Sequence, residues 1–351
     1  MGGPTIGGAG HGEPRGWAVP NLLQQPPSYV RDHLKVLEHA LDQPVAAGGV
    51  PAKTGDAVLI ATWNLRELGR FTAKWKSTAD DTPKRDLRSL LFIATILERF
   101  DVIALQELQD HTAALREVLC WLNRDMANRW RILVSDVVEG EDGDRERLGY
   151  LVDSSRYDFD GLAGELVIPP EEIGVSSARL DHQFAKTPYA VSFRSVRDVD
   201  VAFVLVTVHI VWGSDAALRV KEANRLADWM ADWAADPTVW DSDIFALGDF
   251  NIDRIVNEDG TTNPVYQPFA DTLTIPQKMH AFPRTVFGGG KDKHYDQITW
   301  IDAPVGTFSL TFDDCGYVDT LGILGPGFGM APTQFSFRIS DHFPMWARFL
   351  L

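Results

Sequence analysis

Short apolar runs alternate with helical patterns along most of the chain. Consecutive apolar residues predict buried strands at 58–63, 102–106, 189–193, 201–209 and 244–247. Apolar residues at three- and four-residue steps predict helices at 84–100, 112–123 and 216–233. Further strands are predicted at 130–138, 148–152, 297–301 and 345–349. The segment between 153 and 186 shows no regular pattern.

The two ends of the chain differ from this middle part in composition and in the elements they predict. Residues 1–55 form an N-terminal extension that is Gly/Pro-rich at its start and contains one predicted amphipathic helix over 28–41. Residues 56–351 form the main domain. Its last third is loop-rich, with turns predicted at Asn263-Pro264, Gly288-Gly289-Gly290 and Gly325-Pro326-Gly327.

Polar residues stand where five of the apolar runs stop. The runs end in Asn64, Glu107, His209, Asp249 with Asn251, and the triplet Ser340-Asp341-His342. Side chains at strand ends sit on rigid supports and face one rim of a sheet, where an active site can converge. Oxygen donors of this kind suit hard cations such as Mg²⁺, Ca²⁺ or Mn²⁺.

Each of these residues also has a local interpretation. Asn64 fits a turn cap, Glu107 fits a helix cap, and Asp249 with Asn251 fits an Asx-turn. The joint pattern favours a site, because local turns alone do not require these residues at the ends of so many strands.

Two carboxylates are candidates to orient two histidines. Asp296 is placed to orient a histidine, and the strand-end positions of His342 and His209 are expected to bring both near it; Glu146 could support His209 in the same way. A histidine held by a carboxylate keeps one tautomer and gains basicity, which suits it to proton transfer. A single histidine of this kind is more often a hydrogen-bonded surface or core residue.

Composition and charge narrow the class of protein. The 351 residues are 45% apolar with 11 Trp, as in a globular protein, and the net charge is −16. That charge excludes binding to nucleic acid by basic charge alone. Only Cys120 and Cys315 are present, and we expect both to be reduced. With neither a signal peptide nor a membrane-spanning apolar run in the sequence, a cytoplasmic protein without membrane contact is predicted.

The motifs together resemble the endonuclease/exonuclease/phosphatase superfamily, and within it the deoxyribonuclease I branch. The resemblance covers about 57–350 and rests on motifs in the family's order: Trp63-Asn64-Leu65-Arg66, Leu105-Gln106-Glu107, Arg145-Glu146-Arg147, Val208-His209, Gly248-Asp249-Phe250-Asn251, Tyr295-Asp296-Gln297-Ile298 and Ser340-Asp341-His342-Phe343-Pro344. It implies an α/β fold, a four-layer α/β/β/α sandwich of two packed mixed β-sheets flanked by helices. Periodicity alone does not yield this architecture.

The resemblance also implies roles for the residues. Asn64 and Glu107, supported by Asp341, would bind Mg²⁺ or Mn²⁺, with Ca²⁺ as a candidate for an additional structural ion. The catalytic set would be His209 with Glu146, His342 with Asp296, and Asp249 with Asn251 orienting water and phosphate oxygens. The sequence leaves open which of Asp249, His209 and His342 accepts the proton from water.

The implied activity is hydrolysis of phosphodiester bonds by the catalytic domain, residues 56–351. An endonuclease acting on DNA is expected, with RNA or a nucleotide as other substrates. A lipid or inositol phosphate phosphoesterase and a catalytically silent binding module of the same fold are the alternatives. The oligomeric state is left open.

Departures from the branch bear on the substrate. Gln109 stands where the branch has an arginine for the DNA minor groove, and Asp144 stands where it has a tyrosine. Asp144 belongs to an acidic loop with Glu139, Glu141 and Asp142, which would repel a phosphate backbone. Arg66 and Lys186 match basic positions of the branch and are predicted to bind substrate phosphate.

Overall fold

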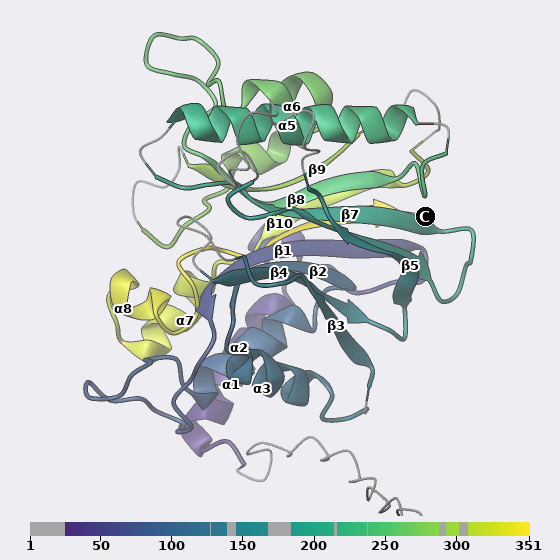
Figure 1. Ribbon diagram of the computed structural model, residues 1–351. Coiled ribbons are helices and arrows are strands. Elements are labelled where there is room, and N and C mark those ends of the chain that lie inside the picture. The colour runs from purple at the N-terminus through teal and green to yellow at the C-terminus, as the bar shows by residue number, and fades with distance from the viewer. Residues whose placement is uncertain are drawn as a thin grey trace, which may run out of the picture.

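Two β-sheets packed face to face form the centre of the protein (Figure 1). The computed structural model describes residues 25–126, 128–138, 145–167, 184–213, 216–236, 238–287, 293–301 and 308–351. The residues of the acidic loop, Glu139, Glu141, Asp142 and Asp144, lie outside these ranges, as do the Gly/Pro-rich first residues and the Gly288-Gly290 turn.

The first sheet has six strands in the order β10-β11-β1-β2-β4-β3. Only β1 and β2 run parallel within it, and every other neighbouring pair is antiparallel. The bounds are β1 Ala57–Leu68, β2 Val102–Gln109, β3 Trp130–Val134, β4 Glu146–Asp153, β10 Thr311–Tyr317 and β11 Met345–Leu350.

The second sheet has five strands in the order β5-β6-β7-β8-β9. It repeats the plan of the first, because β7 and β8 are parallel and the other neighbours are antiparallel. The bounds are β5 Tyr157–Glu165, β6 Tyr189–Ser195, β7 Ala202–His209, β8 Ile244–Ile252 and β9 His294–Trp300.

Helices cover the outer face of each sheet, so the protein has four layers (Figure 1). Below the first sheet lie α1 Ser28–Leu41, α2 Leu87–Leu97 and α3 Ala113–Leu122, and above the second lie α5 Ala216–Ala235 and α6 Gln267–Thr272. The short helices α7 Thr320–Phe328 and α8 Pro332–Ser336 lie at one side of the first sheet. The four-layer α/β/β/α sandwich implied by the resemblance is confirmed.

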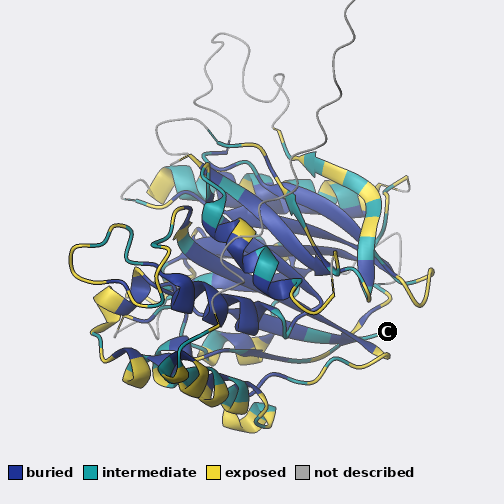
Figure 2. Ribbon diagram, turned by 90° about the horizontal axis from the view of Figure 1, so that it is seen from below, coloured by how far each residue is buried: buried dark blue, intermediate teal, exposed yellow. Residues whose placement is uncertain are grey.

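The hydrophobic core follows these layers as three clusters. Along β1, Leu59 and Ala61 face the helices while Val58 and Ile60 face the other sheet, so both faces of the strand are buried. A third cluster joins the second sheet to α5 and α6. In Figure 2 the strands are accordingly dark blue along most of their length, and exposed residues gather on outer helix faces and loops.

Local sequence explains where the main helices begin and what they bury. The Asp86 side chain caps α2 by accepting a hydrogen bond from the backbone N–H of Ser89 at 2.9 Å. This start makes α2 shorter than the predicted helix at 84–100. Val30, Leu37 and Leu41 of α1 pack in the same cluster as α2, and α1 has the bounds expected for the helix of the N-terminal extension.

Several elements in the last third and one edge strand were not predicted. The sequence shows no regular pattern after residue 153, but β5 forms there and pairs with β6. The exposed, glycine-containing sequence of β5 reflects the place of this strand at the edge of the sheet. The turn predicted at Gly325-Pro326-Gly327 is wrong, because these residues lie inside α7. The prediction of a loop-rich last third also omitted β10, α6 and α8. These short segments gain their stability from tertiary packing.

Candidate active site

The topology brings the polar strand ends to one edge of the molecule. The central parallel pairs β1–β2 and β7–β8 each end at this edge, since parallel strands point the same way. Strands β4, β9 and β11 run antiparallel to them and therefore begin at this edge. The residues that arrive here are those predicted from the sequence: Asn64, Glu107, Glu146, His209, Asp249, Asn251, Asp296, Asp341 and His342.

Backbone irregularities turn these side chains out of the sheets. The pairing register shifts at the ends of β1, β2 and β8, as it does where an extra residue forms a β-bulge. At these shifts Arg66, Glu107 and Asn251 have positive φ values of 41°, 57° and 47°. Left-handed backbone costs a residue with a side chain roughly 1–2 kcal/mol. Such outliers cluster at functional sites, where the surrounding structure maintains them.

Gly248 is required by the close approach of β7 to β8. Its φ is 137°, and a Cβ atom at this position would lie 2.1 Å from the backbone oxygen of Val208. No other residue fits without moving one strand. The glycine of Gly-Asp-Phe-Asn therefore allows Asp249 to lie directly opposite His209 in the parallel register.

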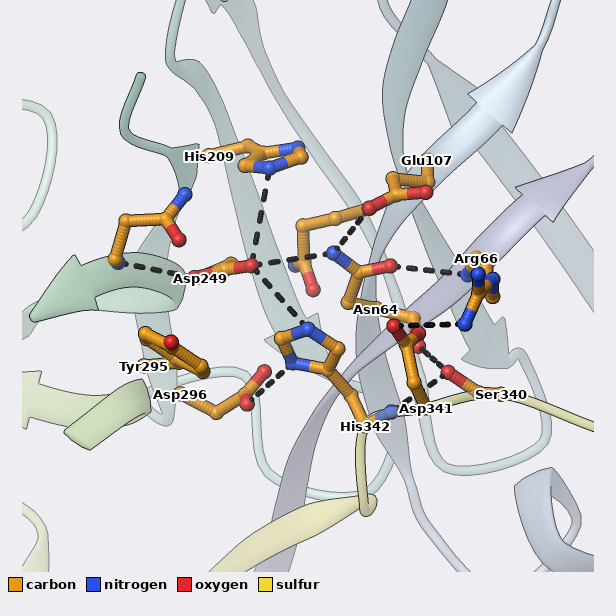
Figure 3. A network of polar contacts seen from close by, with 12 residues as sticks. Asn64, Arg66, Glu107, His209, Asp249, Tyr295, Asp296, Ser340, Asp341 and His342 are labelled. Atoms are coloured by element: carbon orange, nitrogen blue, oxygen red, sulfur yellow. Dashed lines mark hydrogen bonds and ion pairs between the residues drawn. The ribbon is translucent and has the colours of Figure 1, made fainter. Parts of the chain in front are cut away.

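Two histidines flank the Asp249 carboxylate (Figure 3). Nε2 of His209 and Nε2 of His342 each lie 3.7 Å from Oδ2 of Asp249. That distance exceeds a hydrogen bond, so neither ring is bonded directly to this oxygen. The other Asp249 oxygen, Oδ1, accepts the backbone N–H of Asn251 at 2.9 Å. The Asx-turn interpretation is thus correct, and the turn leaves Oδ2 of Asp249 facing the two histidines.

A carboxylate lies behind each histidine. Nδ1 of His342 is 2.7 Å from Oδ2 of Asp296, and Nδ1 of His209 is 3.1 Å from Oε2 of Glu146. All four side chains are buried, with His342 the most exposed at 9%. Buried carboxylates in these positions orient both rings with Nε2 towards Asp249. The structure therefore brings together both predicted histidine–carboxylate pairs.

The two histidines have opposite pKa shifts. The pKa of His209 is lowered to about 4, first by burial and then by the Lys186 ammonium. Burial also acts to lower the pKa of His342, but Asp296 and Asp249 outweigh it and raise this pKa well above its ordinary value. At neutral pH His209 is therefore neutral and His342 is protonated. Titratable groups pushed apart in this way are suited to act as a base and an acid.

Glu107 is the residue best placed to hold a cation. It accepts hydrogen bonds from Nδ2 of Asn64 at 2.8 Å and from the backbone N–H of Glu67 at 3.0 Å. Burial raises its pKa, and within the described ranges no lysine or arginine forms an ion pair with it. Ligand atoms of Glu107, Glu146 and His209 lie within 4.8 Å of one another. This donor set fits a divalent cation.

The other two predicted metal ligands have polar partners already. Oδ1 of Asn64 accepts the backbone N–H of Arg66 at 3.0 Å, while its Nδ2 joins Glu107 to Asp249 at 2.8 and 3.2 Å. Asp341 binds Nη1 of Arg66 at 3.0 Å. Asn64 is thus central to the site, and Asp341 reaches it through Arg66, the residue predicted to bind phosphate.

Ser340 and Arg85 hold the chain that carries Asp341 and His342. Oγ of Ser340 donates to the backbone oxygen of Asn64 at 2.6 Å and accepts the His342 backbone N–H at 3.0 Å. The buried Arg85 guanidinium donates to five backbone oxygens, those of Leu65, Arg66, Glu67, Arg338 and Ile339. It therefore ties the end of β1 to the segment before β11. Sequence reasoning missed Arg85, because one arginine before an apolar helix gives no local signal.

The site opens into a cleft of about 970 Å³. Besides the residues above, Lys186, Gln109, Trp212, Phe287, Lys293 and Tyr295 line it. Nζ of Lys186 lies 3.5 Å from Oε2 of Glu146 and 3.5 Å from Nε2 of His209, so this predicted phosphate ligand borders the reacting groups. Trp212, Phe287 and Lys293 were not predicted, because no motif contains them.

No helix in the part of the chain that the structure describes combines the length and the apolarity needed to cross a membrane.

Comparisons with known proteins found sequence relatives and structures of similar fold. No family model matches the chain. A deoxyribonuclease from Thioalkalivibrio sp. (strain K90mix) is 25% identical over 299 residues, which cover 83% of this chain and 70% of that protein. Deoxyribonuclease-1 from Bos taurus is 28% identical over 209 residues, covering 57% of this chain and 62% of that protein. The chain thus matches less than two thirds of the bovine enzyme.

Solved structures support the fold independently of sequence. The endonuclease/exonuclease/phosphatase from Bacteroides vulgatus superposes with a TM-score of 0.53 at 14% identity, covering 85% of this chain and 100% of that one. Fold, order of motifs and sequence relatives point the same way. The chain therefore has the fold of this endonuclease/exonuclease/phosphatase and is similar in sequence to deoxyribonucleases, in agreement with the resemblance to the deoxyribonuclease I branch.

Proposed function

We propose that this protein is a divalent-metal-dependent phosphodiesterase, and specifically an endonuclease that hydrolyses DNA. The observation that carries the proposal is the arrangement around Asp249. Two histidines with opposite pKa shifts, each held by a carboxylate, face one oxygen of Asp249. Glu107, which forms no ion pair with a lysine or arginine of the described ranges, lies beside them. In-line hydrolysis of a phosphodiester needs these parts, namely a positioned water, a proton acceptor, a proton donor and positive charge.

Different side chains of the protein transfer the protons and position the groups that do so. Water held at Oδ2 of Asp249 gives its proton to neutral His209, and protonated His342 donates a proton to the leaving oxygen. Glu146 and Asp296 keep the two rings in position. Asn251 is a positioning residue, because its Nδ2 donates to the backbone oxygen of Ile210 at 2.6 Å and its backbone N–H fixes Asp249.

Asn64 and Glu107 would hold the metal ion, with Asp341 in support, and Mg²⁺ or Mn²⁺ fits these oxygen donors. When bound, the ion supplies positive charge that offsets the charge developing on the phosphate oxygens. Lys186 and Arg66 lie at the cleft and would contact those same oxygens. A separate structural Ca²⁺ is proposed on the resemblance alone.

The relatives' names support a nucleic-acid substrate. Both sequence relatives quoted above are called deoxyribonucleases, and DNA is therefore the substrate proposed for this chain. A cytoplasmic location is proposed because Cys120 and Cys315 keep free thiols. Cell fractionation with an antibody to the protein tests the location.

Cleavage of closed circular DNA, as a duplex plasmid and as a single-stranded circle, tests the function, because a circle has no ends for an exonuclease. With Mg²⁺ or Mn²⁺ the wild type should nick the circle, and His209→Ala or His342→Ala should lose about 10²–10⁴-fold in rate. His39→Ala, an exposed histidine on α1, is the matched control and should keep full activity.

Two results would count against the proposal. Nicking that survives both histidine substitutions would place the activity elsewhere. Release of phosphate from inositol phosphates by a protein that leaves both circles intact would favour the small-phosphoester alternative.

A further inference from the structure

Two large aromatic side chains line the catalytic cleft and remain exposed. Trp212 is 73% exposed and Phe287 is 38% exposed. Trp212 follows His209 by three residues, and Phe287 follows Thr285, which pairs with His342 in an isolated β-bridge. The two aromatic side chains therefore belong to segments that emerge beside the two reacting histidines.

Exposed apolar residues on protein surfaces are common when scattered singly. Here they are not scattered. Among the described residues five aromatic side chains are exposed: Phe159, Trp212, Trp240, Phe287 and Phe337. Two of the five line the cleft, and a third, Phe337, lies under the cleft-lining Arg66, whose guanidinium carbon is 4.2 Å from the ring centroid. The neighbourhood of the reacting groups thus concentrates exposed aromatic surface.

The charge of the cleft does not suit a duplex backbone. Five carboxylates line it, against three lysine or arginine side chains and the protonated His342, which Asp296 holds. Each cation also lies near a carboxylate: Arg66 at 3.0 Å from Asp341, Lys186 at 3.5 Å from Glu146 and Lys293 at 2.7 Å from Asp253. Duplex DNA is gripped mainly through charge on its phosphates. This cleft supplies little net positive charge for that purpose.

Aromatic side chains recognise a different feature, the face of a base. Stacking contributes roughly 5- to 150-fold in affinity for each base. In a duplex these faces are covered by neighbouring base pairs, whereas an unpaired strand presents them. The cleft volume of about 970 Å³ also falls near the top of the roughly 300–1,000 Å³ that enclose small ligands, and suits a few nucleotides better than a double helix.

We propose that the cleft binds single-stranded nucleic acid, with bases stacked on Trp212 and Phe287 on either side of the scissile phosphate. The inference rests on the proposed phosphodiesterase function and specifies its substrate. Trp212 and Phe287 are specificity residues, whereas Asp249 and the two histidines act on the phosphate. A wedge of the same side chains into a duplex is the rival interpretation, and it requires that duplex be cleaved well.

The test compares three substrates of equal length: a single-stranded oligonucleotide, the same strand annealed to its complement, and a chain of abasic phosphodiesters. We expect the wild type to cleave the single strand at least 10-fold faster, as kcat/KM, than the duplex. Trp212→Ala should lower kcat/KM on the single strand about 10-fold and leave the abasic chain unchanged, because only the former has bases to stack. Trp212→Phe should keep most of the activity.

Trp240→Ala is the matched control, since Trp240 is 54% exposed and its Nε1 contacts Asp160, which is not among the residues lining the cleft. It should leave all three rates unchanged. Equal cleavage of duplex and single strand, or an equal loss on the abasic chain in Trp212→Ala, overturns the inference while the phosphodiesterase stands. A wild type that cleaves none of the three overturns the proposed function and this inference with it. DNA and RNA versions of the single strand identify the sugar preferred.

Discussion

His209 should make the metal-free protein less stable as the pH falls from 7 to 5. Its pKa in the folded protein is lowered to about 4, whereas an unfolded chain has the ordinary value of 6.5. The unfolded state therefore binds a proton in this pH range and the folded state does not. By linkage, acidification favours the unfolded state.

The magnitude follows from the two pKa values. A shift of about 2.5 pKa units corresponds to roughly 3 kcal/mol in total, of which about 2 kcal/mol falls between pH 7 and pH 5. Solvent screening takes little from this figure, because His209 is only 4% exposed. His342 acts in the opposite direction: the folded state keeps its proton because its pKa is raised, whereas the unfolded chain, at the ordinary value of 6.5, gains one as the pH falls. This contribution is common to the wild type and to a variant at His209, so it cancels when the two are compared.

The assay is urea unfolding in the presence of a chelator, followed by tryptophan fluorescence, at pH 7, 6 and 5. Wild type and His209→Gln are compared, because the glutamine keeps a polar side chain but cannot titrate. The wild type should lose about 2 kcal/mol more than the variant between pH 7 and pH 5. A difference between the two proteins that stays constant with pH would refute the assigned pKa.

Three further predictions concern the rest of the site. Mn²⁺ at 100 times its Kd should stabilise the folded wild type by roughly 2.7 kcal/mol, and Glu107→Gln should lose most of this stabilisation; a rise in Tm with Mn²⁺ equal to that of the wild type would contradict this. In Asp296→Asn the pKa of His342 should fall, because the carboxylate that raises it is gone. The alkaline limb of the pH–rate profile should then move to lower pH, with kcat down roughly 10²-fold at alkaline pH; an unshifted profile would argue against this. Arg85→Met removes a hydrogen-bond donor from five backbone oxygens and should lower the free energy of unfolding in urea by about 3–5 kcal/mol; a loss under about 1 kcal/mol would show that water replaces the guanidinium.

Much of the site was predictable because it lies at the ends of strands. The apolar runs of β1, β2, β7 and β8 are visible in the sequence, and the polar residues that end them stand out against that background. The order of the motifs gave the family resemblance, and with it the four layers. Local interpretations of Asn64 and Asp249 as turn formers were also sound, because both side chains accept a backbone N–H two residues on.

The edges of the sheets were less predictable. β5 exposes every second residue over most of its length and includes two glycines, and β10 begins with four partly or fully exposed positions. Edge strands bury little, so their sequences carry little of the apolar signal on which prediction depends. The helices α6 and α8, of six and five residues, are too short to show a period.

The sequence by itself indicated most of the polar residues that reach the site, since they stand where apolar runs end. Only the tertiary structure decided how they are partnered: the opposite protonation of His209 and His342, the contact of Arg66 with Asp341, and the five backbone oxygens around Arg85. It also decided that Trp212 and Phe287 border the cleft. These features depend on burial and on distances between segments far apart in the chain, and both are set by the packing of the two sheets.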